Sequence, residues 1–164
     1  MALQSKMVVY AAIAGMLALM GFFAWYASLE NPELEKVELD LIGVEIGDVN
    51  KVENTAEVKV TFLVTNPGEK TFTIALINYD LFADGEFLVT GQYSTADIPM
   101  PGRPIFSSGI QIPIENTSEL QKSEISNDLY QAVLDGKISK FKVEGMITTE
   151  SAWSIVEKEF EAST

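Results

Sequence analysis

The fold of this chain is decided by residues 58–92, which read VKVTFLVTNPGEKTFTIALINYDLFADGEFLVTGQ. In residues 58–65 the apolar side chains alternate with Lys and Thr, apart from Leu63, and this is the pattern of a strand with one buried face. Residues 71–81 are rich in β-branched and aromatic residues, as a central strand is. Two neighbouring strands are therefore predicted at the centre of the fold.

Two turns punctuate this stretch. Asn66 and Pro67, followed by Gly68, predict a turn between the strands, because Pro fixes φ and Gly accepts positive φ. Asp84-Gly85 lies between two apolar runs and is the strongest hairpin signal in the chain. The stretch therefore predicts consecutive antiparallel strands.

Outward from this centre, the period of two recurs at residues 37–46, 110–114, 141–147 and 153–160. The turn-rich residues 97–104 predict a connection between sheets. A helix is predicted over residues 117–134, with Leu120, Leu129 and Val133 on its apolar side and Gly136 as its stop. Six to eight strands and one helix predict an all-β class, a β-sandwich over residues 37–161 with a tail at 162–164.

The amino-terminal segment is of a different kind. Residues 7–29 carry no charge, and a helix of that length spans the roughly 30 Å hydrocarbon core of a bilayer. A cleaved signal peptide is the competing interpretation, but its apolar region is shorter and cleavage after Ala27 would place Trp25 at the −3 position. We therefore expect an uncleaved single-pass anchor, followed by a linker at 30–36.

The charges that flank the apolar segment predict its orientation. Lys6 and the amino terminus precede it, whereas Glu30, Glu33 and Glu35 follow it. The positive-inside rule then places residues 1–6 in the cytoplasm and the remainder of the chain outside the cell membrane.

The apolar segment also carries a stripe of small residues. They recur at three- and four-residue steps on one helix face, which would allow close approach of a partner helix in lipid: Ala11, Ala14, Gly15, Ala18 and Gly21. The alternative is that Ala and Gly are simply common in membrane helices.

Composition excludes most function classes. The chain has no Cys and no His, which removes disulfides, zinc sites, thiolate nucleophiles and Ser-His-Asp triads. After residue 29 the charges sum to −14, and such an acidic body is unsuited to nucleic acid or to anionic lipid head groups. We expect no enzyme activity, no cofactor, no metal and no small-molecule substrate.

The order of these motifs resembles the WHy domain, the water-stress and hypersensitive-response module shared with second-type late-embryogenesis-abundant proteins. The resemblance covers residues 35–161 and rests on the residue 58–92 stretch, on Ile98-Pro99 and Pro101-Gly102, and on the strands IQIPI and FKVEGMI. It implies a fibronectin type III or immunoglobulin-like sandwich without catalytic residues, associated with stress protection. The anchored, acidic form is similar to membrane-attached archaeal members of that group.

Three candidate sites compete with plainer interpretations. Asp80, Asp84 and Glu86 surround the hairpin but lack the spacing of a calcium loop, so a solvated tip is the simpler interpretation. The acidic residues Glu115, Glu119 and Glu124 have no fixed separation that would make an acid–base pair. Asn116-Thr117-Ser118 is a glycosylation sequon on a predicted loop, with helix capping by Thr117 as the alternative.

Two functions remain open. One is a non-enzymatic protective or interaction module that the anchor displays outside the membrane. The other is an accessory single-span subunit of a larger membrane complex, for example an archaeal respiratory assembly or a membrane monooxygenase. The small-residue stripe favours the second function, because a lone anchor needs no packing face.

Overall fold

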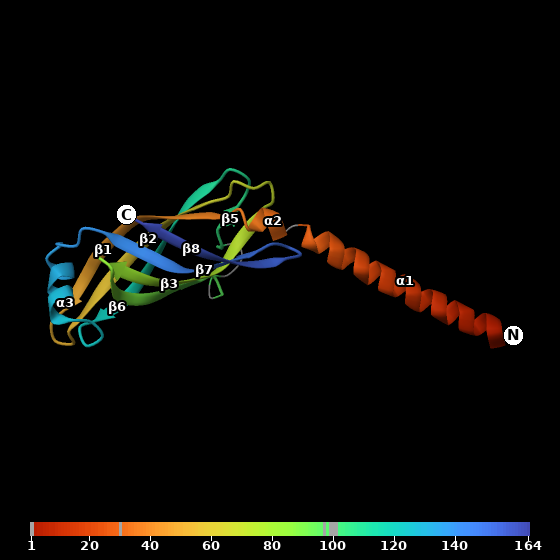
Figure 1. Ribbon diagram of the computed structural model, residues 1–164, viewed down its shortest axis with the longest axis horizontal. Helices are drawn as coiled ribbons and strands as arrows, with labels where there is room; N and C mark the ends of the chain where they lie inside the picture. Colours follow the sequence, from red (N-terminus) through yellow and green to blue (C-terminus); the bar gives the residue numbers. More distant parts are fainter. Residues whose placement is uncertain (1, 30, 97, 99–101) are drawn as a thin grey trace.

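A computed structural model of the chain describes residues 2–29, 31–96, 98 and 102–164. The elements are α1 (Ala2–Ser28), α2 (Asn31–Leu34), β1 (Glu38–Asn50), β2 (Thr55–Thr65), β3 (Phe72–Ala83), β4 (Glu86–Ser94), β5 (Ile105–Phe106), β6 (Gln111–Gln121), α3 (Asn127–Leu134), β7 (Phe141–Glu150) and β8 (Ile155–Ser163). In Figure 1, α1 extends away from the strands, at the end of the body that also carries α2 and β5. The predicted class, a β-sandwich behind one long apolar helix, is confirmed.

The sandwich consists of two antiparallel sheets. The smaller sheet has the order β1-β2-β6, and the larger has the order β4-β3-β7-β8, with β5 paired to β3. The inward face of β2 is fully buried at Val58, Val60, Phe62 and Val64, as the alternation predicts. Phe62 meets Tyr79 of β3 edge-on, at a centroid distance of 5.0 Å, so the two central strands hold the core together.

The predicted hairpin is confirmed at Asp84-Gly85. These residues have φ values of 49° and 91°, and Ala83 pairs directly with Glu86. Two consecutive positive φ values define the tight hairpin turn that Asp-Gly favours. β3 and β4 are therefore joined as an antiparallel hairpin, with a register shift between Leu81 and Phe82.

The predicted helix at 117–134 is wrong in its first half. β6 continues to Gln121, and α3 begins at Asn127 with Ser126 as its N-cap, whose side chain accepts from the Leu129 amide at 3.2 Å. Leu120 belongs to the strand and is fully buried. The predicted stop is confirmed at Gly136, where φ is 65°.

The limits of the sandwich also differ from the expectation. Residues 31–34, inside the predicted linker, form α2, and its Leu34 is fully buried in the core. β8 continues to Ser163, through most of the predicted tail. Residues 97–104 are predicted to connect the sheets, but they lie between β4 and β5, which both belong to the larger sheet; residues 97 and 99–101 among them lie outside the described residues. The chain passes between the sheets after β2, in the loop between β5 and β6 at residues 107–110, and from β6 through α3 to β7.

β8 ends the larger sheet in the part of the chain that the structure describes. Along it, Glu157, Glu159 and Glu161 are exposed, while Val156 faces the core. The outer face of this edge strand thus carries carboxylates at every second residue from Glu157 to Glu161.

Candidate functional site

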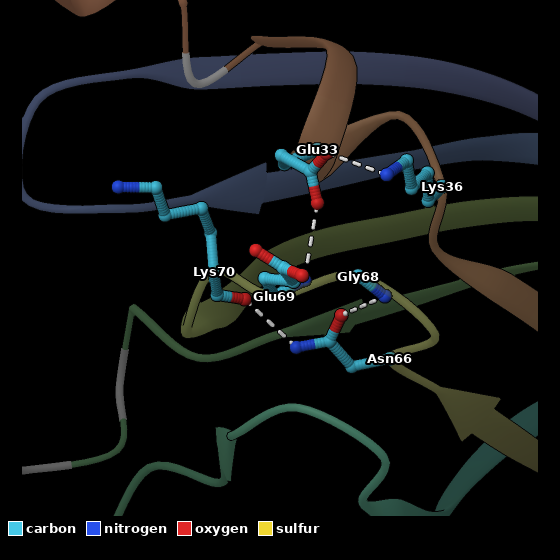
Figure 2. Close-up of polar contacts among 6 residues, drawn as sticks. All are labelled: Glu33, Lys36, Asn66, Gly68, Glu69 and Lys70. Carbon is cyan, nitrogen blue, oxygen red and sulfur yellow. Dashed lines mark hydrogen bonds and ion pairs between the residues drawn. The ribbon is translucent and has the colours of Figure 1, made fainter.

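The most elaborate arrangement of polar groups lies where the apolar helix meets the sandwich. We call it the joint and define it by Asn31, Glu33, Leu34, Asn66, Gly68, Glu69 and Ser154. These residues come from α2, from the turn between β2 and β3, and from the turn between β7 and β8. Figure 2 shows the part of the joint formed by α2 and the first of these turns.

Asn66 is the centre of the joint. Its side chain is fully buried, and its Nδ2 donates to the carbonyls of Lys70 and Phe106, both at 2.8 Å. Its Oδ1 accepts from the Gly68 amide at 3.0 Å. One amide side chain therefore closes its own turn and ties that turn to β5, forty residues later.

The backbone of Asn66 fixes a third segment. Its amide donates to the Ile110 carbonyl at 3.1 Å, and its carbonyl accepts from the Gly109 amide at 2.7 Å. The Asn-Pro motif is the predicted turn, but it also holds the connection that leads into β6.

Gly68 lets α2 approach this turn closely. A Cβ at this position would lie 3.0 Å from the Glu33 carbonyl oxygen, which is closer than side chains normally approach a backbone. Glu33 then reaches across the gap, and its carboxylate accepts from the Glu69 amide at 3.0 Å (Figure 2). The short helix α2 is thus bonded to a turn 36 residues away.

The charge on Glu33 is held by its partners. The Lys36 ammonium donates to the carboxylate and, together with the Glu69 amide, keeps the pKa of Glu33 below its usual range. Because the folded-state pKa is depressed, the carboxylate stabilises the joint above the usual glutamate pKa. This contribution is lost as the pH falls through the folded-state pKa.

We therefore expect acid to weaken the hydrogen bond between the Glu33 carboxylate and the Glu69 amide. The protection of the Glu69 amide from hydrogen exchange, corrected for the intrinsic rate, should fall as the pH drops below the usual glutamate range. Glu33→Gln, whose neutral side-chain oxygen is a weaker acceptor and does not titrate, should show reduced protection already at neutral pH and little further change in acid. The matched control is Glu35→Gln, at an exposed position of the same segment. Identical acid dependence in Glu33→Gln and the original chain would contradict this role.

Two further contacts hold the other side of the joint. The Ser154 hydroxyl donates to the Asn31 side-chain oxygen, which links α2 to the turn between β7 and β8. The Lys158 ammonium donates to the Val37 carbonyl at 2.6 Å, and Val37 is itself buried. The chain therefore enters the sandwich along a fixed path.

The sequon residues lie within a strand instead of on a loop. Asn116 and Ser118 are half-buried in β6 and turn toward Tyr79 of the opposite sheet. Asn116 Nδ2 donates to the Tyr79 hydroxyl at 2.9 Å, and Ser118 Oγ lies 3.3 Å from the same hydroxyl. Thr117 caps no helix, and these polar groups connect the two sheets. Glycosylation at Asn116 remains a prediction.

The acidic hairpin residues are dispersed. Asp84 accepts from the amides of Ser139 and Lys140, the latter at 2.9 Å, whereas Asp80 accepts from Thr90 Oγ1 at 2.6 Å. Glu86 is exposed at the start of β4. Within the described ranges, no three carboxylates come together in a way that could hold a metal ion. Asp84 stabilises the chain that enters β7.

Of the three acidic residues near β6, Glu115 and Glu119 are apart, whereas Glu119 and Glu124 line the same shallow hollow beside β4. Glu115 forms an ion pair with Lys59 at 2.7 Å, and Glu119 lies four residues further along the strand, a separation of roughly 13 Å. Glu124 is exposed in the turn after β6. The separation of Glu115 and Glu119 exceeds that of the paired carboxylates of glycosidases, which is at most about 9.5 Å.

The side chains of α1 from Lys6 to Ser28 are exposed apart from the half-buried Ala27, so the helix does not pack into the sandwich. It is the one helix among the described residues long and apolar enough to cross a membrane, and its side chains are exposed on all faces. The predicted stripe lies along it, and a Cβ at Gly15 or Gly21 would meet no atom within 4 Å.

Sequence reasoning missed three features of this end of the molecule. The burial of Asn66, the docking of α2, and the exposure of Trp153 in the turn before β8 all depend on contacts between distant segments. A signal for α2 was present, since Asn31-Pro32 is a typical helix start.

Comparison with known proteins supports the fold. No protein-family model matches the chain, and no curated protein sequence matches it. The solution structure of AT1g01470 from Arabidopsis thaliana is similar, with 16% identity and a TM-score of 0.50, over 77% of this chain and 80% of that one. A likeness at this identity shows the fold alone.

Two other solved structures overlap less well. A protein from Archaeoglobus fulgidus has 14% identity and a TM-score of 0.47, over 80% of this chain and 94% of that one. A putative late embryogenesis abundant protein, At2g46140.1, has 14% identity and a TM-score of 0.37, over 96% of this chain and 87% of that one. The predicted resemblance to the WHy and late-embryogenesis-abundant group is confirmed as a likeness of fold.

Proposed function

We propose that this chain is a membrane-anchored, non-enzymatic WHy-like domain, displayed outside the membrane in a protective or interaction role. The joint is the observation that supports this function best. Only two residues separate α1 from α2, and α2 is bonded to the turns that hold Asn66 and Ser154. A helix exposed on all its apolar faces requires lipid or another apolar partner.

The chemistry of the body supports a non-enzymatic role. The chain offers no thiol or imidazole, and the carboxylates singled out by sequence are engaged by backbone amides, hydroxyls or lysine, or are exposed on the surface. A protective role acting through broad polar contact fits a surface of this kind.

Anchoring and sidedness can be tested together, because the chain has no native cysteine. Val52 is 90% exposed in the turn between β1 and β2, and Lys6 precedes the apolar segment. In intact cells, a membrane-impermeant maleimide should label Val52→Cys, whereas Ser5→Cys, which leaves Lys6 in place, should react only after lysis. Both variants should stay with the membrane in alkaline carbonate. The reverse labelling pattern would contradict the orientation, and release by carbonate would contradict the anchor.

The second candidate function is an accessory subunit of a membrane complex. It is favoured by the small-residue stripe, which nothing in the described chain occupies. On native gels of gently solubilised membranes, a subunit should migrate with a large assembly at fixed stoichiometry. Gly15→Leu combined with Ala18→Leu should release it, whereas Met16→Leu combined with Met20→Leu, on the opposite helix face, should not. An independent protective module should migrate alone and tolerate an unrelated anchor.

A further inference from the structure

Large apolar side chains are exposed at the end of the sandwich that carries the joint. Ile105, Trp153 and Ile155 are exposed by 57%, 65% and 66%, and we call them the end patch. Water-exposed isoleucine and tryptophan in this number at one end of a small domain point to a surface that something covers.

The register of the larger sheet places the end patch in one row. Ile105 pairs with Thr73, Thr73 with Glu150, and Glu150 with Ile155. Directly paired residues project to the same face of a sheet, so the two isoleucines lie on its outer face. Trp153 lies in the turn between Glu150 and Ile155, at the tip of the same row.

The end patch lies beside the exit of the apolar helix. Ser154, the neighbour of Trp153, donates to Asn31, which follows the last residue of α1 by three positions. Three residues span at most roughly 10 Å. Figure 1 shows the turn between β7 and β8 extending toward the same side as α1. The turn that carries Trp153 is therefore held close to the point where α1 ends.

The length and the aromatic residues of α1 place that end at the bilayer surface. Its 27 residues measure about 40 Å, which exceeds the roughly 30 Å hydrocarbon core. Trp25 and Tyr26, in its last turn, are exposed as residues of an interfacial aromatic belt would be. Trp153 is then the second tryptophan of the chain at this level.

From this arrangement we propose that the end patch inserts into the interface of the bilayer that α1 spans. Trp153 occupies the boundary between headgroups and acyl chains, and Ile105 and Ile155 rest on it at either side. The inference depends on the proposed anchoring of α1. The proposed driving force is apolar and aromatic contact rather than attraction to anionic lipid, because Glu150 lies in the same row between Ile105 and Ile155.

The test uses the two tryptophans separately. The full-length Trp25→Phe variant, reconstituted at low density into phosphatidylcholine vesicles, reports Trp153 alone. Lipids brominated near the carbonyl end of their acyl chains should quench about half of its emission, because quenching by bromine requires contact with lipid. Adding anionic lipid or salt should leave the quenching unchanged. In the same variant, Ile105→Ser with Ile155→Ser should reduce the quenching.

The outcomes separate this inference from the anchoring itself. The Trp153→Phe variant reports Trp25, so lack of quenching there would overturn the anchoring. Quenching of Trp25 with red-shifted, unquenched emission from Trp153 would overturn insertion of the end patch. Blue-shifted emission without bromine quenching would show that a second protein copy covers Trp153, and it would overturn the proposal equally.

Discussion

Replacing Asn66 with alanine should lower the free energy of unfolding by about 3–5 kcal/mol. The substitution leaves the Lys70 and Phe106 carbonyls and the Gly68 amide without their partner. Each backbone group deprived of its partner in a buried site costs about 1–3 kcal/mol. The loss should appear in urea unfolding of the full chain in detergent, monitored by tyrosine fluorescence and circular dichroism.

The aspartate variant sharpens the argument. Asn66→Asp keeps the acceptor for Gly68 but places a carboxylate oxygen opposite two carbonyl oxygens. It should be at least as destabilising as Asn66→Ala at neutral pH and partly recover in acid, where the protonated side chain can donate once. Asn78→Ala, at an exposed position of β3, should change the stability by less than about 0.5 kcal/mol. Equal losses of unfolding free energy in Asn66→Ala and Asn78→Ala would contradict the central structural role of Asn66.

The second large effect is expected at Gly91. A Cβ there would overlap the Cζ and hydroxyl of Tyr79 and lie 2.7 Å from Ser118 Oγ. The ring cannot retreat, because it is buried, packs on Phe62 and is bonded to Asn116 across the sandwich. Overpacking of this kind costs about 3 kcal/mol in Gly91→Ala.

A double-mutant cycle isolates the cause. In a Tyr79→Leu background, which removes the ring end and hydroxyl, Gly91→Ala should cost less than about 1 kcal/mol. Gly43→Ala is the matched control, because its Cβ would meet only the Thr61 Cβ, at the ordinary distance of 3.9 Å. Equal losses of unfolding free energy in Gly91→Ala and Gly43→Ala would mean that the Tyr79 ring moves aside at little energetic cost.

The contrast between prediction and structure follows from the range of the interactions. The strand over residues 58–65 and the Asp84-Gly85 hairpin are encoded by neighbours along the chain, so alternation and turn chemistry predicted them. β6 was shortened in the prediction because two members of its inward row, Asn116 and Ser118, are polar. Tyr79 from the other sheet satisfies them, and no local pattern carries that information.

The joint could not be predicted from the sequence either, because it also depends on contacts between segments that are distant along the chain. Asn66-Pro67 was correctly predicted as a turn, yet the buried amide is stabilised by Phe106, and the turn is bonded to Glu33, on segments far away in sequence. The residues near the hairpin were singled out by their charge, whereas the structure disperses them. Burial and long-range pairing, rather than residue type, mark the joint.

The row of carboxylates along β8 has a consequence for crowded membranes. An open strand edge invites a neighbouring molecule to add its own strand, and such additions propagate into aggregates. Here a second copy aligned on β8 would bring Glu157, Glu159 and Glu161 against equivalent charges. In the proposed anchored form, this repulsion should keep chains that are crowded in the plane of a membrane apart instead of letting them add strand to strand.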